Sequence, residues 1–217
     1  MKKTLDEIAV SYGTDKSSKA HFYTKHYESN FEKLRLSKLK ILEIGVQDGF
    51  SLKTWKEYFE NSDIYGIDLT DLTVFNEDRI TVLVGNQSDT NFLLNVNNTY
   101  GPFDIIIDDG SHKSNDIRAS FNILFPVLKE GGIYVIEDLH TNYWEKKNFI
   151  PSWFINEKHT TFIDDIKNLI DSVNSGGKSG YANRDFDESS SMEEMTWWEK
   201  NVESISMYRS ICFIKKI

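Results

Sequence analysis

Short apolar runs alternate with stretches of helical periodicity through the first two thirds of the chain. The runs are rich in Ile, Leu, Val and Tyr and span residues 40–46, 63–69, 80–85, 103–110 and 132–139. Between them, apolar residues recur every three or four positions, which predicts helices over 51–60, 88–97 and 114–128. Alternating strands and helices indicate βαβ units, and almost continuously apolar runs suit a parallel sheet covered on both faces. We therefore predict an α/β fold, with a doubly wound, mostly parallel sheet of about seven strands.

The last third of the chain has a looser pattern. One amphipathic helix is predicted around 159–173, and the segment 174–195, rich in Gly, Ser and acids, is predicted to be a loop, either a lid or an excursion without a role. Two β-like runs that meet near Tyr208 to Ser210 predict an antiparallel pair at the sheet edge. We predict one domain with four parts: an N-terminal lid or helical segment (1–37), a core (38–144), an acceptor-side insertion with a mobile loop (145–200) and closing strands (201–217).

Composition narrows the functional classes. The formal net charge of −9 disfavours partners with phosphate backbones or anionic lipid surfaces, so neither nucleic acid nor membrane is an expected partner. The chain contains one cysteine, Cys212, and so forms no internal disulfide. It has no apolar window of about 18 residues and no apolar signal region at its start. These features predict a cytoplasmic protein.

A loop with two glycines follows the first predicted strand, in the run LEIGVQDGFS at 42–51. Gly45 and Gly49 would let the backbone approach a ligand closely. The spacing differs from the dinucleotide fingerprint, and no Walker lysine follows, which disfavours NAD and nucleoside triphosphates. Glu43 would repel a pyrophosphate but suits a sulfonium centre, and Asp68, which ends the second strand, can accept hydrogen bonds from ribose hydroxyls. We therefore predict that S-adenosylmethionine binds here; the alternative is glycines that serve only a turn, with Asp68 capping its strand.

Acidic residues end the fourth and fifth predicted strands. Asp109 follows the fourth strand, and Glu137 and Asp138 follow the fifth. If these strands are neighbours, the three carboxylates converge, and like charges that share a site raise each other's pKa. A hard divalent cation such as Mg²⁺ or Mn²⁺ would offset that repulsion. We predict a metal site at Asp109, Glu137 and Asp138.

The same loop contains a candidate general base. His112 lies three residues after Asp109 and could accept a proton from an alcohol whose pKa the metal lowers. Other interpretations remain open: Asp108 binds cofactor while Asp109 caps a turn and His112 is a surface residue, or Asp109, His112 and His140 bind iron(II) in a hydroxylase or oxidoreductase. A non-catalytic cofactor-binding module is a further alternative.

Several motifs together resemble the bacterial metal-dependent sugar O-methyltransferases, especially those of macrolide and mycinose biosynthesis. They are YGTDK at 12–16, HYE at 26–28, LEIGVQDG at 42–49, WKEYF at 55–59, YGIDL at 65–69, GNQSD at 85–89, YGPFDIIIDDGSH at 100–112 and LFPVLKEGGIYVIEDLHTNYW at 124–144. The resemblance implies a class I, Rossmann-like methyltransferase fold that uses S-adenosylmethionine and Mg²⁺. It also implies that Asp109, Glu137 and Asp138 bind the metal, that His112 is the base, and that the cofactor site includes Glu43, Gly45, Gly49, Ser51, Asp68, Gln87, Ser88 and Asp108. The YGTDK motif looks like part of a lid.

The expected acceptor is a hydroxyl of a sugar, whether on a nucleotide-linked or lipid-linked saccharide or on a glycosylated small molecule. Aromatic residues that could stack on a sugar face, or equally pack in the core, are Tyr143, Trp144, Trp153 and Phe154. The macrolide-sugar enzymes have a large extra N-terminal domain, whereas this chain starts almost at the lid motif. Homo-oligomerisation is therefore left open.

Overall fold

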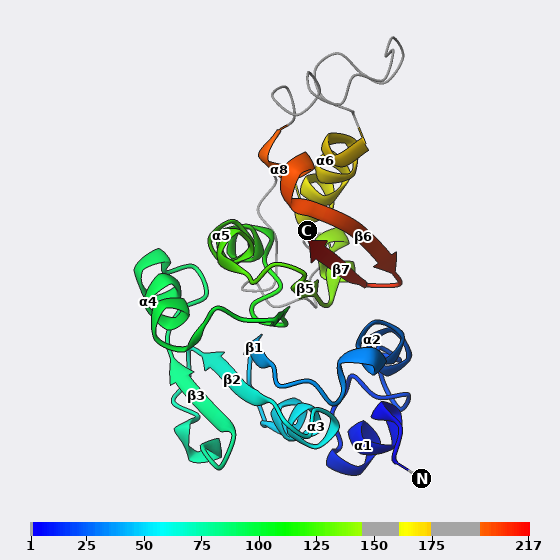
Figure 1. Ribbon diagram of the computed structural model, residues 1–217, viewed down its shortest axis with the longest axis vertical. Helices are drawn as coiled ribbons and strands as arrows, with labels where there is room; N and C mark the ends of the chain where they lie inside the picture. Colours follow the sequence, from blue (N-terminus) through cyan, green and yellow to red (C-terminus); the bar gives the residue numbers. More distant parts are fainter. Residues whose placement is uncertain (1, 145–160, 175–195) are drawn as a thin grey trace.

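A seven-stranded sheet forms the centre of the molecule in the computed structural model, which describes residues 2–144, 161–174 and 196–217 (Figure 1). Its strands are β1 (Lys40–Ile44), β2 (Asp63–Asp68), β3 (Ile80–Val84), β4 (Ile105–Asp108), β5 (Ile133–Ile136), β6 (Val202–Tyr208) and β7 (Ile211–Lys216). They are ordered β3-β2-β1-β4-β5-β7-β6. The first five strands are parallel, whereas β7 pairs antiparallel with both β5 and β6. The predicted fold class and terminal strand pair are confirmed.

Helices cover both faces of this sheet. One layer contains α1 (Leu5–Tyr12), α2 (Thr24–Phe31) and α3 (Phe50–Tyr58), and the other contains α4 (Thr90–Tyr100), α5 (Ser114–Val127), α6 (Phe162–Asn174) and α8 (Trp197–Asn201). Three short 3₁₀ helices are η1 (Glu32–Leu34), η2 (Thr73–Phe75) and η3 (Leu139–Tyr143). None of the helices described here has the length and apolar character needed to cross a membrane.

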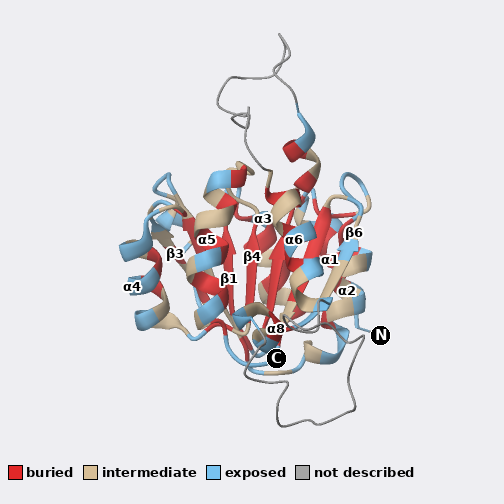
Figure 2. Ribbon diagram, turned by 90° about the horizontal axis from the view of Figure 1, so that it is seen from above, coloured by how far each residue is buried: buried red, intermediate tan, exposed pale blue. Residues whose placement is uncertain are grey.

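The strands are buried on both faces because successive side chains point into two different cores. On β4, Ile105 and Ile107 pack with the α1–α3 layer, whereas Ile106 packs with the α4–α6 layer. Figure 2 shows the buried strands at the centre, with exposed residues on the outer sides of the helices. The continuous apolar runs of the sequence follow from this two-sided burial.

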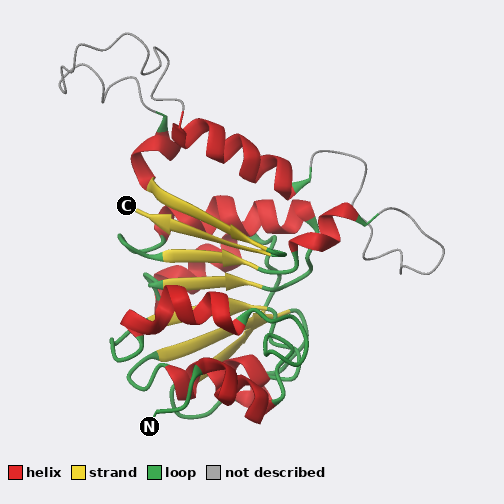
Figure 3. Ribbon diagram, turned by 90° about the vertical axis from the view of Figure 1, so that its right-hand side faces the viewer, coloured by secondary structure: helices red, strands yellow, loops and turns green. Residues whose placement is uncertain are grey.

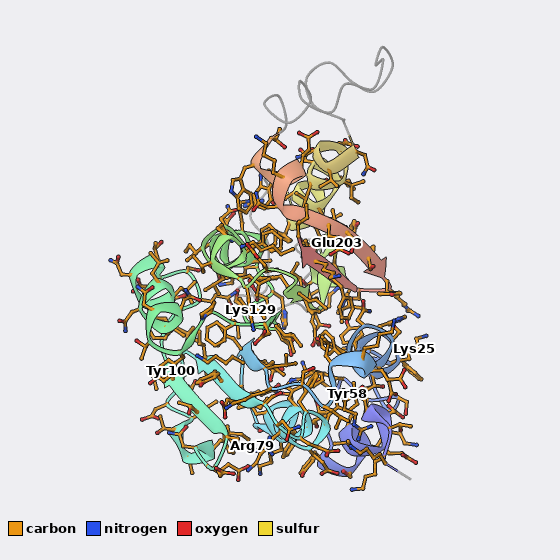
Figure 4. All side chains as sticks on the ribbon, in the orientation of Figure 1. Lys25, Tyr58, Arg79, Tyr100, Lys129 and Glu203 are labelled. Carbon is orange, nitrogen blue, oxygen red and sulfur yellow. The ribbon has the colours of Figure 1, made fainter. Side chains whose placement is uncertain are left out.

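The predicted elements differ from the observed ones mainly at their ends. The run 132–139 stops being a strand at Ile136, because Asp138 adopts the left-handed backbone conformation (φ 53°) and starts η3. The helix predicted over 51–60 ends at Tyr58. The Arg79 guanidinium donates to the carbonyl of Lys56 in its last turn and to those of Phe59 and Ser62 beyond its end (Figure 4). The predicted loop 174–195 lies outside the described residues, apart from Asn174, which ends α6.

The chain order around the sheet reverses between β1 and β4. From β1 the chain proceeds outward through β2 and β3, then crosses back to β4 on the other side of β1. In doubly wound sheets, ligands bind at the carboxyl ends of the strands at such a switch point. Figure 3 shows the strands side by side, with the loops after the carboxyl ends of the parallel strands gathered at one edge.

Candidate active site

The glycine loop lies at this switch point and leaves no room for a side chain. Gly45 has φ 94°, and a Cβ atom there would lie 2.1 Å from the carbonyl oxygen of Asp109. Gly49 also has a left-handed backbone, with φ 68°, and is the N-cap of α3. One carboxylate oxygen of Asp68 accepts hydrogen bonds from the amides of Val46 and Gln47, at 3.0 and 3.3 Å. The close approach of the two strand ends therefore requires glycine at position 45.

Two adjoining cavities open beside the loop. The larger, of about 590 Å³, extends from Gly13–Lys16 past the glycine loop to Asp109, His112 and Asp138. The smaller, of about 180 Å³, lies over the ends of β1, β2 and β3. Of the residues predicted to bind cofactor, the cavities are lined by Gly45, Ser51, Asp68 and Gln87. The remaining four, which are not among the lining residues, are Glu43, Gly49, Ser88 and Asp108.

Asp108 is buried and orders one wall of the smaller cavity. It accepts hydrogen bonds from the Gln87 amide nitrogen at 3.1 Å, from the Tyr134 hydroxyl at 3.1 Å and from the Ser120 hydroxyl. The other end of Gln87 accepts from the backbone amide of Ser111 at 2.7 Å. Burial raises the pKa of Asp108, with these donors opposing the rise. Asp108 thus positions Gln87, which is the residue of the pair that faces the cavity.

Ser88 does not line the cavities, but it contacts Asp116, which lines the smaller one. Its hydroxyl donates to Asp116 at 2.7 Å, and Asp116 accepts from Ser111 at the same distance. Asp116 lies in the first turn of α5, so this pair of hydrogen bonds joins the loop after β3 to the loop after β4.

Asp109, His112 and Asp138 converge at the ends of β4 and β5. Each offers one ligand atom, and these atoms lie within 4.8 Å of one another. His112 Nδ1 lies 4.0 Å from Asp109 Oδ1, and its Nε2 lies 3.8 Å from Asp138 Oδ2. His112 and Asp138 both have positive φ values, of 57° and 53°, a conformation that costs a non-glycine residue roughly 1 kcal/mol or more. Two of the three metal ligands expected from the sequence, Asp109 and Asp138, lie in this cluster together with His112, the expected base, whereas Glu137 is not among its members.

Glu137 lies beside this cluster and contacts Lys16, a residue that sequence reasoning placed only in a lid motif. The Lys16 side chain is 2% exposed, and its ammonium lies 2.5 Å from Asp109 Oδ2, 3.0 Å from Glu137 Oε1 and 3.4 Å from Glu43 Oε1. Burial disfavours the ammonium charge, but the three carboxylates outweigh it and raise the pKa of Lys16 well above its usual range. Lys16 is therefore the fixed counter-charge of the buried acids.

Two tyrosines of the N-terminal segment also contact the predicted metal ligands. Tyr23 donates its hydroxyl to Asp138 Oδ1 at 2.6 Å, and Tyr27 donates its hydroxyl to Glu137 Oε1. Burial raises the pKa of Glu137 well above its usual range, and the charge of Asp109 adds to the rise. Burial alone would also raise the pKa of Asp138, but the hydrogen bond from Tyr23 and the charges of His112, His21 and His140 lower it instead.

Glu43 differs from the expectation that it faces the ligand. It is fully buried within β1, where one oxygen accepts from Ser51 at 2.8 Å and the other faces Lys16. Burial raises the pKa of Glu43 to about 7, against the pull of Lys16. Glu43 therefore contacts the Lys16 ammonium and, through Ser51, the start of α3.

A third cavity, of about 960 Å³, lies on the other side of Asp138, and it is lined by residues of α2, η3, α6 and the β6–β7 turn. His21 and His140, two of its lining residues, have ring nitrogens 3.8 and 3.9 Å from Asp138 Oδ1. His140 Nδ1 also lies 2.6 Å from the Ser210 hydroxyl oxygen, and within the described ranges His140 is not part of the metal-ligand cluster. Of the predicted stacking aromatics, Tyr143 lines this cavity, Trp144 packs against His140, and Trp153 and Phe154 lie outside the described residues.

The amino-acid sequence of this chain is similar to those of known methyltransferases. A family model described as a methyltransferase domain matches residues 42–139. Demethylmacrocin O-methyltransferase of Streptomyces fradiae is 37% identical over 229 residues, which cover 99% of this chain and 53% of that protein. Mycinamicin VI 2''-O-methyltransferase of Micromonospora griseorubida is 35% identical over 222 residues, with coverage of 99% and 53%. The chain thus spans about half the length of the curated relatives it matches.

Two solved structures of a methyltransferase also resemble this chain. The MycE methyltransferase of the mycinamycin pathway, in complex with Mg and SAH, superimposes with a TM-score of 0.84 at 33% identity, covering 100% of this chain and 54% of that one. MycE in complex with Mg, SAH and mycinamycin VI matches with a TM-score of 0.81, also at 33% identity, covering 99% of this chain and 55% of that one. The chain therefore contains a methyltransferase domain with a class I fold, and over nearly its whole length it is similar to the O-methyltransferases named above.

Proposed function

We propose that this chain catalyses the transfer of a methyl group from S-adenosylmethionine to a hydroxyl of a sugar, with a divalent metal ion as cofactor. The main support is the convergence of Asp109, His112 and Asp138 beside the cavity of the glycine loop. The relatives named for sugar methylation and the MycE complexes with Mg and SAH agree with this proposal. Mg²⁺ and Mn²⁺ are the cations proposed for the site.

The donor atoms fit such a cation. Two oxygens on opposite sides of a Mg²⁺ ion lie about 4.2 Å apart, and Asp109 and Asp138 belong to a cluster whose donor atoms lie within 4.8 Å of one another. The proposed ligands are these two aspartates and Glu137, which follows the strand that pairs with β4 and lies beside the cluster. A bound divalent cation would orient the acceptor hydroxyl and lower its pKa.

The residues of the chain supply positioning and proton transfer. Asp68 and Gln87 line the part of the cavity where the nucleoside would bind, and a methyl donor held by the glycine loop would lie next to the acid cluster. His112, within 4.0 Å of both aspartates, would accept the acceptor's proton as the methyl group moves from sulfur to oxygen. The net result is S-adenosylhomocysteine, a methyl ether and a proton on His112.

A by-product assay tests the proposal, with demethylmacrocin and mycinamicin VI, the acceptors in the relatives' names, as substrates. We expect S-adenosylhomocysteine to form with Mg²⁺ present, to stop forming in excess EDTA and to form again when Mg²⁺ is restored. The substitution His112→Ala should lower turnover by roughly 10²–10⁴-fold while S-adenosylhomocysteine still binds. Unchanged turnover in EDTA would refute the metal requirement. Cofactor binding without metal binding or transfer to any tested glycoside would instead support a non-catalytic module.

A further inference from the structure

Each carboxylate proposed as a metal ligand has at least one hydrogen-bond or ion-pair partner in the N-terminal segment. Lys16 contacts Asp109, Tyr27 contacts Glu137 and Tyr23 contacts Asp138. These donors reach across 93, 110 and 115 residues of sequence, respectively. One short segment thus supplies a separate polar partner to every member of the proposed ligand set.

The contacts divide the oxygens of the two aspartates in the same way. Lys16 and Tyr23 contact Asp109 Oδ2 and Asp138 Oδ1, whereas the other oxygens, Asp109 Oδ1 and Asp138 Oδ2, lie nearest to His112. On Glu137, both Lys16 and Tyr27 contact the same atom, Oε1. The N-terminal donors thus contact one oxygen of each carboxylate, Asp109 Oδ2, Asp138 Oδ1 and Glu137 Oε1. In our proposal, the second oxygen of each carboxylate binds the metal ion.

The donors are themselves held in place. The carbonyl of Lys16 accepts from the amides of Tyr23 and Thr24, at 2.9 and 3.1 Å, so the lysine fixes the start of α2. Tyr27 is fully buried and packs edge-on against Trp55 and Phe213, at ring-centroid distances of 4.9 and 5.3 Å. Residues that orient metal ligands from outside the coordination sphere act in this manner, and losing one typically costs about 10–100-fold in metal affinity.

We propose that Lys16, Tyr23 and Tyr27 form an N-terminal clamp that orients Asp109, Asp138 and Glu137 for the divalent cation. The three are positioning residues, and the inference rests on the proposed metal-dependent function. The Lys16 ammonium also offsets part of the negative charge of Asp109, Glu137 and Glu43. Without it, the metal ion would be the main positive charge beside these buried carboxylates. The clamp extends the proposed site to Lys16, in the loop after α1, and to the start of α2.

Binding of Mn²⁺, followed by electron paramagnetic resonance of the full chain, tests the clamp without any acceptor. The variants Tyr23→Phe and Tyr27→Phe remove a single hydroxyl each, and Lys16→Met removes the ammonium. We expect each to raise the Mn²⁺ dissociation constant by about 10–100-fold. S-adenosylhomocysteine binding, measured by calorimetry in EDTA, should change less than about twofold. Tyr12→Phe is the matched control, because Tyr12 lies in the same segment but its hydroxyl faces Glu57, and it should bind Mn²⁺ like the wild type.

A double-mutant cycle shows whether Tyr23 acts through Asp138. We expect Tyr23→Phe to weaken Mn²⁺ binding in the wild type but to add little in an Asp138→Asn background. Wild-type Mn²⁺ affinity in both tyrosine variants would overturn the proposal, even if Lys16→Met failed to fold. Equal losses of metal affinity, cofactor affinity and melting temperature would also overturn it, because they indicate a general structural role. Absence of Mn²⁺ binding by the wild type would instead refute the metal-dependent function itself.

Discussion

Gly45 is the residue at which backbone geometry most tightly limits the sequence. Gly45→Ala combines a strained backbone with a methyl group 2.1 Å from the Asp109 carbonyl oxygen, so the glycine loop and the end of β4 must separate. We expect the free energy of unfolding to fall by more than about 3 kcal/mol and S-adenosylhomocysteine binding to be lost. Denaturant titration and calorimetry measure the two effects.

Gly131 is a matched control for this substitution. It has a similar backbone, with φ 72°, but no atom lies within 4 Å of the position that a Cβ would occupy. Gly131→Ala should therefore cost only the backbone strain, about 1 kcal/mol, and should leave cofactor binding intact. Equal losses in the two variants would show that the close approach to Asp109 is not the reason for glycine at position 45.

Glu43 makes the stability of the protein depend on pH. Because burial raises its pKa from 4.5 to about 7, the folded protein binds more protons than the unfolded chain between these values. Its contribution is therefore fully present below pH 4.5 and is lost as pH rises through about 7. We expect Glu43→Gln to gain roughly 3 kcal/mol relative to the wild type between pH 4.5 and 8. Urea titrations of both proteins across this range measure the difference, and a constant difference would contradict the raised pKa.

At the scale of elements, α1 orders the loop that precedes α2. Asp6 on α1 accepts from the amide and hydroxyl of Ser18, at 2.7 and 2.6 Å, and from the Thr24 hydroxyl at 2.6 Å. The Asp6→Ala variant should therefore loosen residues 14–24 without unfolding the sheet. We expect hydrogen-exchange protection of the Tyr23 and Thr24 amides to fall about tenfold or more, because hydrogen bonds to a charged group contribute about 1.5–3 kcal/mol each.

An N-cap in the opposite helix layer gives the control for this prediction. Asp89 accepts from the amides of Asn91 and Phe92 at the start of α4. The Asp89→Ala variant should cost about 1 kcal/mol of helix stability and leave exchange in residues 14–24 unchanged. If both variants raised exchange in that loop equally, Asp6 would have no specific role in ordering it.

At the scale of the whole molecule, the C-terminal strand joins the N-terminal helices to the sheet. Phe213 on β7 packs against Tyr27 and Phe31 of α2 and against Tyr208 of β6, at ring-centroid distances of 5.3, 6.0 and 5.8 Å. The substitution Phe213→Ala should lower the free energy of unfolding by roughly 3–5 kcal/mol. Phe22→Ala, at a side chain that is 56% exposed, should change it by less than about 0.5 kcal/mol. Denaturant titration measures both changes. If Phe213→Ala lowered the free energy of unfolding by less than about 1 kcal/mol, the packing of Phe213 between α2 and β6 would not be important for stability.

The sequence by itself determined the order of the elements and the edge of the sheet where the site forms. Alternating apolar runs and helical periods are local patterns, and the acids that end β4 and β5 share one edge because the carboxyl ends of adjacent parallel strands do. Asp109 and Asp138 could therefore be expected near each other from their positions in the chain, and both lie in one cluster with His112. Gly45 and Asp68, expected to bind the cofactor, both line the cavity beside that cluster.

Only the tertiary structure decided which partners these acids have. Lys16, Tyr23 and Tyr27 reach the acids that follow β4 and β5 because α1 and α2 pack on one face of the sheet and bring these side chains close to those strand ends. The same packing directs Glu43 toward Lys16, and the hydrogen bonds of Asp108 direct it toward Ser120 and Tyr134. A hydrophobic period fixes which face of an element is buried. The position of a single charged or hydroxyl group depends on contacts between residues that are 12 to 115 positions apart in these examples, which no local pattern encodes.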